Sequence, residues 1–371
     1  MKARPVMIMA GGTGGHVFPA LAVAASLGER GVPVVWLGTS RGLEFRLVPA
    51  AGLPLETIGV AGLRGKGVVK LLAAPVMLTR ALLEAASLLR RHRPRLVLGM
   101  GGFASGPGGL AARLLGIPLV IHEQNALPGL TNRWLARLAV RVLQAFPDSF
   151  PPERGALTVG NPVRREICDL PVPAQRLDGR RGPGRLLVVG GSQGALALNQ
   201  LVPQALALMA PDQRPEVCHQ AGGRQLEAAR QAYAQAGVTA HLTPFIDDMA
   251  AAYGWADLAL CRSGALTVAE LAGAGLGSLL VPFPFAVDDH QTRNGRFLAD
   301  AGAAQILPQQ QLTPQLLAGQ LQQLLADRPR LLTMAEAARA LARPRAAEEV
   351  AAHCLEQALP AGRPQSVEKT L

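Results

Sequence analysis

Apolar and polar positions alternate along the chain in a way that predicts short buried strands separated by helices. Runs of four or five apolar residues lead into turns, and longer stretches with helical spacing of alanine and leucine follow them. In the first half the runs predict strands over 6–10, 34–38, 96–99 and 119–122. In the second half they predict strands over 186–189, 216–220, 240–243, 258–261 and 278–282. Strands that alternate with helices are typical of parallel α/β sheets wound by crossover connections.

One unit of strand, glycine loop and helix occurs twice. Residues 7–27 read MIMAGGTGGHVFPALAVAASL, and residues 186–206 read LLVVGGSQGALALNQLVPQAL. Glycines let the backbone turn sharply and bring N–H groups against a ligand, and the positive end of the following helix favours an anion. Neither loop fits the strict dinucleotide fingerprint, and no acidic ribose partner stands at the usual distance beyond the first loop. Tight turns that serve backbone geometry alone are the alternative for either loop, and the repetition weakens that alternative.

The length and composition predict a globular chain of two domains. The chain has 371 residues, of which 49% are hydrophobic and 41 are glycine. A stretch rich in proline and arginine over 150–185 marks the boundary. We therefore predict a first domain over 1–160, a second over 161–345, and a helical end with a disordered tail over 346–371. Two such sheets facing each other would form a cleft at the carboxyl ends of their strands, where ligands bind in this class of fold.

Cysteine spacing and uncharged stretches exclude several classes of protein. The cysteines lie far apart with no C-x-x-C pair, which argues against structural zinc and a disulfide framework; they are Cys168, Cys218, Cys261 and Cys354. The uncharged stretches 186–211 and 271–287 are interrupted by glycines, prolines or polar residues, so neither predicts a transmembrane helix. The start, MKARPVMIMAGG, has no signal-peptide cleavage pattern, and we expect no export.

The formal net charge of +11 predicts a negatively charged partner or surface. Aromatic residues make up 4% of the chain and no nucleic-acid-binding motif is visible, so we expect no nucleic acid. Residues 63–95 interleave basic and apolar side chains, which favours an anionic membrane surface. The side chains expected on it are Lys66, Lys70, Leu72, Val76, Arg80 and Leu83. An ordinary core helix with a solvated basic face fits the pattern equally well.

A series of glycine-rich and polar motifs runs along the chain. The motifs are GGTGGHVFPALA at 11–22, GMGGFASGPGGLAARLLGIP at 99–118, HEQNALPGLTNRWLA at 122–136, GNPVR at 160–164, GGSQGA at 190–195, FIDDM at 245–249, RSGALTVAELAGAG at 262–275 and DDHQTRN at 288–294. In this order, across residues 6–305, they resemble the MurG family of bacterial glycosyltransferases, in glycosyltransferase family 28. The resemblance implies an α/β GT-B fold, that is, two Rossmann-like parallel-sheet domains facing across a cleft.

The same resemblance implies an inverting hexosyltransferase. It would move N-acetylglucosamine (GlcNAc) from UDP-GlcNAc to the 4-hydroxyl of muramyl-pentapeptide in undecaprenyl-linked lipid I, which gives lipid II for peptidoglycan synthesis. It further implies no cofactor and no metal, a peripheral position on the cytoplasmic face of the bacterial inner membrane, and cell-wall synthesis and division proteins as candidate partners. A UDP-GlcNAc 2-epimerase is the alternative enzyme. A non-enzymatic basic scaffold would leave Glu270, Arg164 and both glycine loops without a purpose.

The second glycine loop and two charged residues suit a donor nucleotide sugar. Backbone N–H groups and the Ser192 hydroxyl can meet the diphosphate, Arg164 can pair with phosphate oxygens, and Glu270 can accept hydrogen bonds from both ribose hydroxyls. A surface ion pair for Arg164 and a T-x-x-E capping box of Thr267 with Glu270 remain alternatives. The resemblance implies further donor contacts at Thr13, Gly14, Gly15, Asn125, the main chain of Ile246, Ala265, Leu266, Thr267, Val268 and Gln291.

His16 is the candidate general base, because a positive helix terminus disfavours imidazolium and keeps a neutral proton acceptor near pH 7. A hydrogen bond to an acceptor phosphate and local capping are its alternatives. The acceptor diphosphate is expected at Thr13, Gly14, Gly15, His16, Gly102 and Ser105. The pairs Asp247–Asp248 and Asp288–Asp289 invite a magnesium site, which we discount because aspartates adjacent in sequence rarely point the same way.

Overall fold

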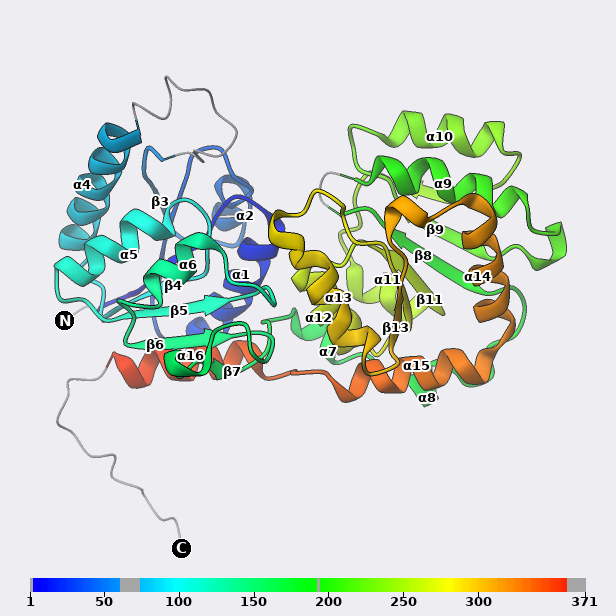
Figure 1. Ribbon diagram of the computed structural model, residues 1–371. Helices are drawn as coiled ribbons and strands as arrows, with labels where there is room; N and C mark the ends of the chain where they lie inside the picture. Colours follow the sequence, from blue (N-terminus) through cyan, green and yellow to red (C-terminus); the bar gives the residue numbers. More distant parts are fainter. Residues whose placement is uncertain (1–2, 61–73, 192–193, 359–371) are drawn as a thin grey trace, which may run out of the picture. The chain divides into compact units, whose positions relative to one another are not determined.

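The computed structural model describes residues 3–60, 74–191 and 194–358 (Figure 1). The chain divides into two compact units. Unit 1 takes residues from 1–123, 128–159 and 345–371, and unit 2 takes residues 124–127 and 160–344. Of the helices within the described ranges, none has the length and apolar character that a bilayer crossing requires. The tail after residue 358, for which we predicted disorder, lies outside the described residues.

Unit 1 is built on a seven-stranded parallel sheet in the order β3-β2-β1-β4-β5-β6-β7. The first six strands have the order of a dinucleotide-binding sheet, in which the strand order reverses between β1 and β4. The strands are β1 (Val6–Met9), β2 (Val34–Gly38), β3 (Leu55–Thr57), β4 (Leu96–Gly99), β5 (Leu119–Glu123), β6 (Arg141–Gln144) and β7 (Leu157–Thr158). The helices are α1 (Gly14–Glu29), α2 (Glu44–Ala50), α4 (Ala74–His92), α5 (Ser105–Leu114), α6 (Leu130–Leu135) and α16 (Ala346–Gln357).

The central strands of unit 1 bury both faces, because successive side chains point to opposite sides of a sheet. Val6 and Ile8 of β1 pack in a cluster with α1 and with Val350 and Cys354 of α16. Met7 and Met9 pack in a second cluster with α4, α5 and α6. Near-continuous apolar runs are what a parallel sheet covered on both sides requires. This explains why the strands of the first half could be predicted from short uninterrupted runs.

Unit 2 repeats the same strand order on a six-stranded parallel sheet, β10-β9-β8-β11-β12-β13. Its strands are β8 (Arg185–Val189), β9 (Glu216–Gln220), β10 (His241–Thr243), β11 (Leu258–Cys261), β12 (Ser278–Leu280) and β13 (Ala304–Ile306). Its helices are α7 (Arg165–Cys168), α8 (Pro173–Leu177), α9 (Leu196–Ala207), α10 (Leu226–Gln235), α11 (Met249–Trp255), α12 (Ala265–Ala274), α13 (His290–Ala299), α14 (Pro314–Ala326) and α15 (Arg328–Ala340). The prediction of two parallel α/β sheets is confirmed.

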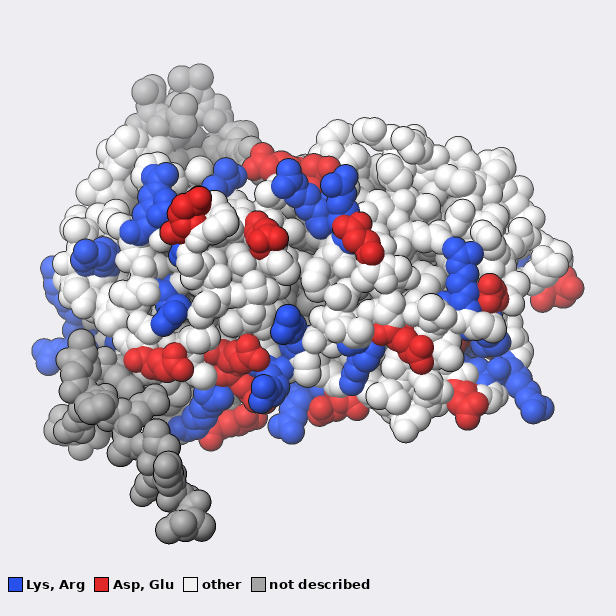
Figure 2. Space-filling view, turned by 60° about the horizontal axis from the view of Figure 1, so that its bottom comes forward, with Lys and Arg blue, Asp and Glu red and all other residues white. Residues whose placement is uncertain are grey.

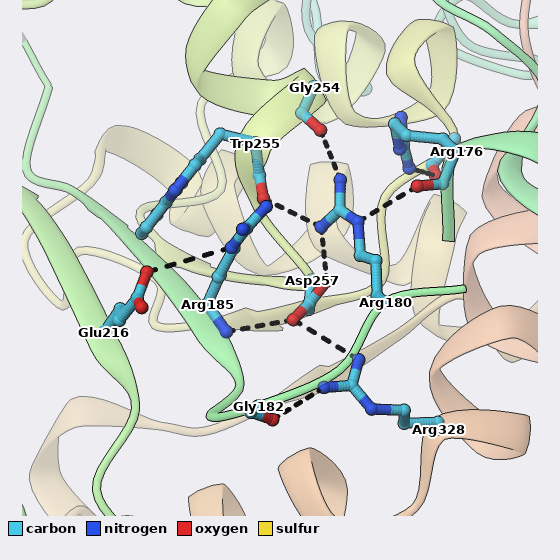
Figure 3. Close-up of polar contacts among 10 residues, drawn as sticks. Arg176, Arg180, Gly182, Arg185, Glu216, Gly254, Trp255, Asp257 and Arg328 are labelled. Atoms are coloured by element: carbon cyan, nitrogen blue, oxygen red, sulfur yellow. Dashed lines mark hydrogen bonds and ion pairs between the residues drawn. The ribbon is translucent and has the colours of Figure 1, made fainter. Parts of the chain in front are cut away.

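A polar cluster lies at the amino-terminal ends of β8 and β11 in unit 2 (Figure 3). Asp257 is 1% exposed, and its carboxylate accepts hydrogen bonds from the Arg180 guanidinium and, at 3.0 Å, from the backbone N–H of Arg185. Arg328 approaches the same carboxylate at 3.7 Å. Arg180 also donates to the backbone oxygens of Gly254, Trp255 and Arg176. One carboxylate therefore balances two guanidinium groups.

Two arginines hold the carboxyl-terminal end of α12. Arg176 donates to the carbonyls of Ala274 and Gly275, and Arg339 donates to the carbonyls of Gly273 and Cys168. The last carbonyls of a helix lack partners within the helix and carry partial negative charge, so guanidinium groups satisfy them well. Burial, aided by the neighbouring charges of Arg180 and Arg339, lowers the pKa of Arg176 to about 10. This anchoring fixes the helix that presents Glu270.

A buried histidine in β9 makes the stability of unit 2 dependent on pH. The His219 side chain is fully buried, its Nδ1 lies 2.9 Å from the Tyr233 hydroxyl, and its Nε2 has no hydrogen-bond partner among the described residues. Burial lowers the pKa of His219 to about 4. Because the unfolded chain takes up the proton below its pKa of about 6.5, the stabilisation is complete above that pH and is lost as the pH falls toward 4.

We predict that lowering the pH from 7.5 to 5 removes about 2 kcal/mol of unfolding free energy through His219 alone. The measurement is urea unfolding at both pH values for the wild type and for His219→Gln, which keeps a polar partner for Tyr233 but does not titrate. Between pH 7.5 and pH 5, the unfolding free energy of the variant should fall by about 2 kcal/mol less than that of the wild type. Equal losses in the two proteins would show that His219 is not the group responsible.

Candidate active site

Both glycine loops follow a central strand at the point where the strand order reverses, which is where ligands bind in such sheets. The first loop leaves β1 and the second leaves β8. Gly12 and Gly191 occupy equivalent places in them and have φ angles of 91° and 85°. A side chain at either position would strain the backbone, so glycine is required there. The two loops predicted from the repeat thus share a left-handed turn at this position.

The first loop leads into α1, which begins at Gly14, so His16 lies at the helix start as predicted. Thr13 stands at the N-cap without a side-chain capping bond, and His16 is the third helical residue and half-buried. A Cβ added to Gly101, in the loop after β4, would lie 2.7 Å from the His16 ring. The imidazole therefore packs on the backbone of the neighbouring loop. This placement is compatible with each of the roles considered for His16, and the role of general base stays a prediction.

Gly102 and Ser105 lie beside the first loop. A Cβ on Gly102 would stand 2.5 Å from the Gly11 carbonyl oxygen, so the two backbones touch. The Ser105 hydroxyl is fully buried and lies 2.7 Å from the Gly101 oxygen and 3.0 Å from the Met9 oxygen. Ser105 thereby connects β1 to the loop after β4. Its contact with an acceptor diphosphate stays a prediction, and in this conformation the hydroxyl proton is directed at protein carbonyls.

The second loop is held by Gln220, at the end of β9. The Gln220 side chain accepts from the N–H of Gly191 at 3.0 Å and donates to the carbonyls of Gly191 and Pro244 at 3.0 and 3.1 Å. It therefore links the loop to the segment that leads to Ile246, which is half-buried. Sequence reasoning missed Gln220, because it predicted only that the residue ends a strand. Ser192 lies outside the described residues.

Helix α12 presents the residues expected around the donor. It begins at Ala265 with Gly264 at the N-cap, so Glu270 is the sixth helical residue and not the third. This rules out the capping-box alternative for Thr267 and Glu270. Ala265 and Val268 are buried, and Leu266 and Thr267 are half-buried. The Ser263 hydroxyl, just before the helix, is buried without a hydrogen-bond partner in the described part of the chain, which makes it a further candidate donor to a ligand.

The Glu270 carboxylate is almost completely buried and has two partners. Tyr253 of α11 donates to Oε2 at 3.0 Å, and Arg164 donates to Oε1 at 3.3 Å. Burial raises the pKa of the Glu270 carboxyl above its ordinary value, and Arg164 and Tyr253 oppose this shift. Arg164 thus forms an ion pair in this structure, and its partner is the buried Glu270 carboxylate, so the pair is not the surface ion pair of the alternative. Tyr253 was missed, because it lies in an alanine-rich helix with no motif of its own.

Asn125 lies in the short segment 124–127 that belongs to unit 2. Asn294, fully buried in α13, accepts from the N–H of Ala126 at 2.8 Å and donates to the Asn125 and Ser263 oxygens at 3.3 Å. Asn294 therefore joins this segment to the start of α12. Gln291, one turn earlier, accepts from the N–H of Phe283 at 2.9 Å. Asn125 and Gln291 consequently both lie near the elements that carry the expected donor contacts.

Other polar residues of the motifs have structural partners. Glu123 is buried and accepts from Gly129 and Asn132 at 3.1 and 2.9 Å. Asp248 caps α11 by accepting from the N–H of Ala251 at 2.8 Å, and Asp289 accepts from Thr292 at 2.7 Å. Within residues 3–60, 74–191 and 194–358, no group of three or more His, Cys, Asp or Glu side chains could hold a metal ion.

Two family models match most of the chain. The glycosyltransferase family 28 N-terminal domain matches residues 6–144, and the C-terminal domain of the same family matches residues 185–350. The Alkalilimnicola ehrlichii UDP-N-acetylglucosamine--N-acetylmuramyl-(pentapeptide) pyrophosphoryl-undecaprenol N-acetylglucosamine transferase is 63% identical, over 95% of this chain and 99% of that protein. The Marinobacter nauticus protein of the same name is 59% identical, over 96% and 98% of the two chains.

Solved structures agree with these matches. The crystal structure of Acinetobacter baumannii MurG has a TM-score of 0.82 to this chain at 45% identity and covers 95% of this chain and 99% of that one. UDP-GlcNAc 2-epimerase from Neisseria meningitidis has a TM-score of 0.66 at 13% identity over 95% and 99% of the two chains, which is a likeness of fold alone. The chain belongs to glycosyltransferase family 28 and, within it, to the MurG enzymes.

Proposed function

We propose that the chain transfers GlcNAc from UDP-GlcNAc to the muramyl 4-hydroxyl of undecaprenyl-pyrophosphoryl-muramyl-pentapeptide. The name of the relatives supplies these substrates. The observation in this chain that carries the proposal is the buried Glu270 carboxylate, oriented by Tyr253 and Arg164 at the edge of the sheet where ligands bind. A carboxylate held in this way can accept hydrogen bonds from the two ribose hydroxyls through its remaining lone pairs.

The donor diphosphate would lie at the second glycine loop and the start of α9. Backbone N–H groups at a helix start stabilise the negative charge that develops on the departing UDP. Arg164 would then have two anionic neighbours, Glu270 and a phosphate, and its guanidinium has enough donors for both. The main chain of Ile246 and the side chains of Asn125 and Gln291 would border the uracil and the sugar.

The acceptor would be held by unit 1. Its diphosphate would meet the N–H groups at Thr13, Gly14 and Gly15, and His16 would take the proton of the attacking hydroxyl. The oxygen of that hydroxyl forms a bond to the anomeric carbon while the bond to the UDP oxygen breaks, so an alpha donor gives a beta linkage. If His16→Ala retains near-normal turnover at saturating substrates, another group must be the base.

One assay distinguishes the candidate functions. The protein is mixed with UDP-GlcNAc, with and without a lipid I analogue, and UDP release is measured. We expect release that depends on the acceptor. Release without acceptor, accompanied by N-acetylmannosamine, would instead identify a UDP-GlcNAc 2-epimerase. Absence of donor binding in a correctly folded sample would contradict both enzymes and leave a non-enzymatic scaffold.

We further propose that unit 1 binds an anionic membrane surface through α4, α5 and α6, with cell-wall synthesis and division proteins as candidate partners there. Helix α4 buries Ala81, Ala85 and Leu89 and leaves Val76 and Leu83 exposed by 74% and 65%. The neighbouring α5 and α6 expose further large apolar side chains, Leu114, Leu130 and Trp134. Exposed apolar groups on adjacent helices, with a tryptophan among them, are typical of a membrane interface.

One of the basic side chains expected on this surface already has an acidic partner. Arg80 forms a 2.8 Å ion pair with Glu84, which also accepts from the Gly59 N–H. That N–H and Arg80 hold the pKa of Glu84 below its ordinary value. Lys66, Lys70 and Leu72 lie outside the described residues. On the face shown in Figure 2, basic and acidic side chains are intermixed, so the net charge is not gathered into one basic patch there.

We predict that Val76→Asp combined with Leu83→Asp lowers vesicle binding by about tenfold or more, because each apolar side chain that enters the interface contributes about 1.5–3 kcal/mol. The probe is co-sedimentation with vesicles rich in phosphatidylglycerol, at low and high salt. Leu208→Asp is the matched control, because Leu208 is an exposed apolar residue of unit 2. Unchanged binding of the double variant would contradict an interface at α4.

A further inference from the structure

The side chain of Glu44 is a buried carboxylate that contacts the first glycine loop. It is fully inaccessible to solvent, at the start of α2. Its Oε2 accepts from the N–H of Gly12 at 2.9 Å, and its Oε1 accepts from the N–H and the hydroxyl of Thr39 at 3.0 and 2.7 Å. All three partners are donors, as an ionised carboxylate requires. Within the described ranges, no cation forms an ion pair with it.

The space around this carboxylate is made by glycines. A Cβ on Gly11, Gly38 or Gly42 would collide with the Glu44 side chain. These three glycines come from the loop after β1, the end of β2 and the turn before α2. Glycine at three converging backbone positions leaves room for a buried side chain that no larger residue would allow. The pocket is therefore shaped to hold Glu44 against the loop.

Gln220 occupies the equivalent place in unit 2. Gly12 and Gly191 correspond in the repeat, and each donates its N–H to a side-chain oxygen that comes from the neighbouring strand or the segment after it. The distances are 2.9 Å to Glu44 and 3.0 Å to Gln220. Glu44 and Gln220 thus contact the two loops with similar geometry but differ in charge, because Glu44 is a carboxylate and Gln220 is an amide.

This difference sets the electrostatics of the two loops apart. A diphosphate at the second loop meets a neutral amide, whereas a diphosphate at the first loop meets a fixed negative charge one hydrogen bond away from Gly12. Like charges brought together in a partly desolvated site strongly disfavour binding. Two similar glycine loops can bind the same ligand. A repulsive group at one of the two loops is then needed to keep that ligand at the other.

We propose that Glu44 is a specificity-determining residue that keeps nucleoside diphosphates and free pyrophosphate off the first glycine loop. It thereby prevents the donor and the released UDP from occupying unit 1. An acceptor diphosphate would bind farther along, at the N–H groups of Thr13, Gly14 and Gly15, and away from Gly12. This inference rests on the proposed function, because it assigns the donor diphosphate to the second loop.

The test is a titration of inorganic pyrophosphate into the full chain with UDP present at saturation, so that the second loop is occupied. We expect Glu44→Gln to bind pyrophosphate at least about tenfold more tightly than the wild type. Thr39→Ala removes a partner of the carboxylate but keeps the charge, and should resemble the wild type. Equal pyrophosphate affinity in Glu44→Gln and the wild type would overturn the proposal, as would equal gains in Glu44→Gln and Thr39→Ala.

The reciprocal change tests the second loop. Gln220→Glu places a carboxylate on Gly191, and Gln220→Met removes the same hydrogen bonds without adding a charge. We expect the Kd for UDP to be at least about tenfold higher in Gln220→Glu than in Gln220→Met. Equal values would contradict the role of charge. Failure of the proposed function is recognised separately, by wild-type protein that releases no UDP when the lipid I analogue is added.

Discussion

Replacing Glu270 with glutamine should weaken the binding of UDP-GlcNAc by about 10²-fold. Hydrogen bonds to a charged group contribute about 1.5–3 kcal/mol each, and 1.4 kcal/mol corresponds to a factor of ten. Glutamine retains one acceptor oxygen, and its amide nitrogen would turn a donor toward Arg164 or a ribose hydroxyl. The measurement is calorimetric titration of UDP-GlcNAc into the wild type and the variant.

Two comparisons make this prediction specific. Tyr253→Phe leaves the carboxylate in place and removes one of its donors, so its effect should be smaller, about tenfold. The 2′-deoxy analogue of UDP should bind the wild type more weakly than UDP does, and Glu270→Gln should bind the two ligands nearly equally. Affinity within twofold of the wild type in Glu270→Gln would contradict a ribose contact.

The raised pKa of Glu270 gives donor binding a pH dependence with a definite sign. Only the ionised carboxylate accepts from both ribose hydroxyls, so affinity should fall as the pH drops through that pKa. Arg164 opposes the rise, and its removal in Arg164→Met should move the midpoint of this fall to higher pH. This separates the effect of Arg164 on Glu270 from any direct contact of Arg164 with phosphate.

Replacing Asp257 with alanine should lower the free energy of unfolding by about 3–5 kcal/mol, because it leaves Arg180 and Arg328 without their shared counter-charge in a buried cluster. Urea unfolding measures the change.

Arg185 and Glu216, drawn in the same close-up, provide the control (Figure 3). They lie 3.8 Å apart and are 38% and 55% exposed, so Glu216→Ala should change stability by less than about 1 kcal/mol. A loss below about 1 kcal/mol in Asp257→Ala would show that the arginines find other partners.

The nine strands predicted from the sequence are all present, and most of them, such as β1, β4 and β11, are apolar runs that are buried on both faces of a sheet. Four others had no such run. β3, β7 and β13 are two or three residues long and lie at sheet edges, where half of the strand faces solvent. β6 has an arginine and a glutamine at its ends. Its pairing with β5 and β7 depends on neighbours that a local pattern does not reveal.

The residues of the candidate site likewise divide into those that a local pattern predicts and those that it does not. The loops, the start of α12 and the place of Glu270 could be predicted, because glycine positions and helix starts are local properties. Glu44, Gln220 and Tyr253 could not, because each is defined by a hydrogen bond to a residue at least 17 positions away. An acidic residue shortly after β2, preceded by Gly38 and Gly42, was the available signal for Glu44. Its distance from the loop is not the usual spacing of a ribose ligand, so that motif does not point to it.

Each unit is assembled from separated stretches of the chain. Residues from 345 onward return to unit 1, where α16 completes the packing of α1, and residues 124–127 belong to unit 2. A hybrid enzyme made by joining two homologues at a single point near residue 160 would therefore pair α1 of one parent with α16 of the other. Exchange of unit 2 between relatives requires a second junction near residue 344, so the exchanged segment has to be an internal one.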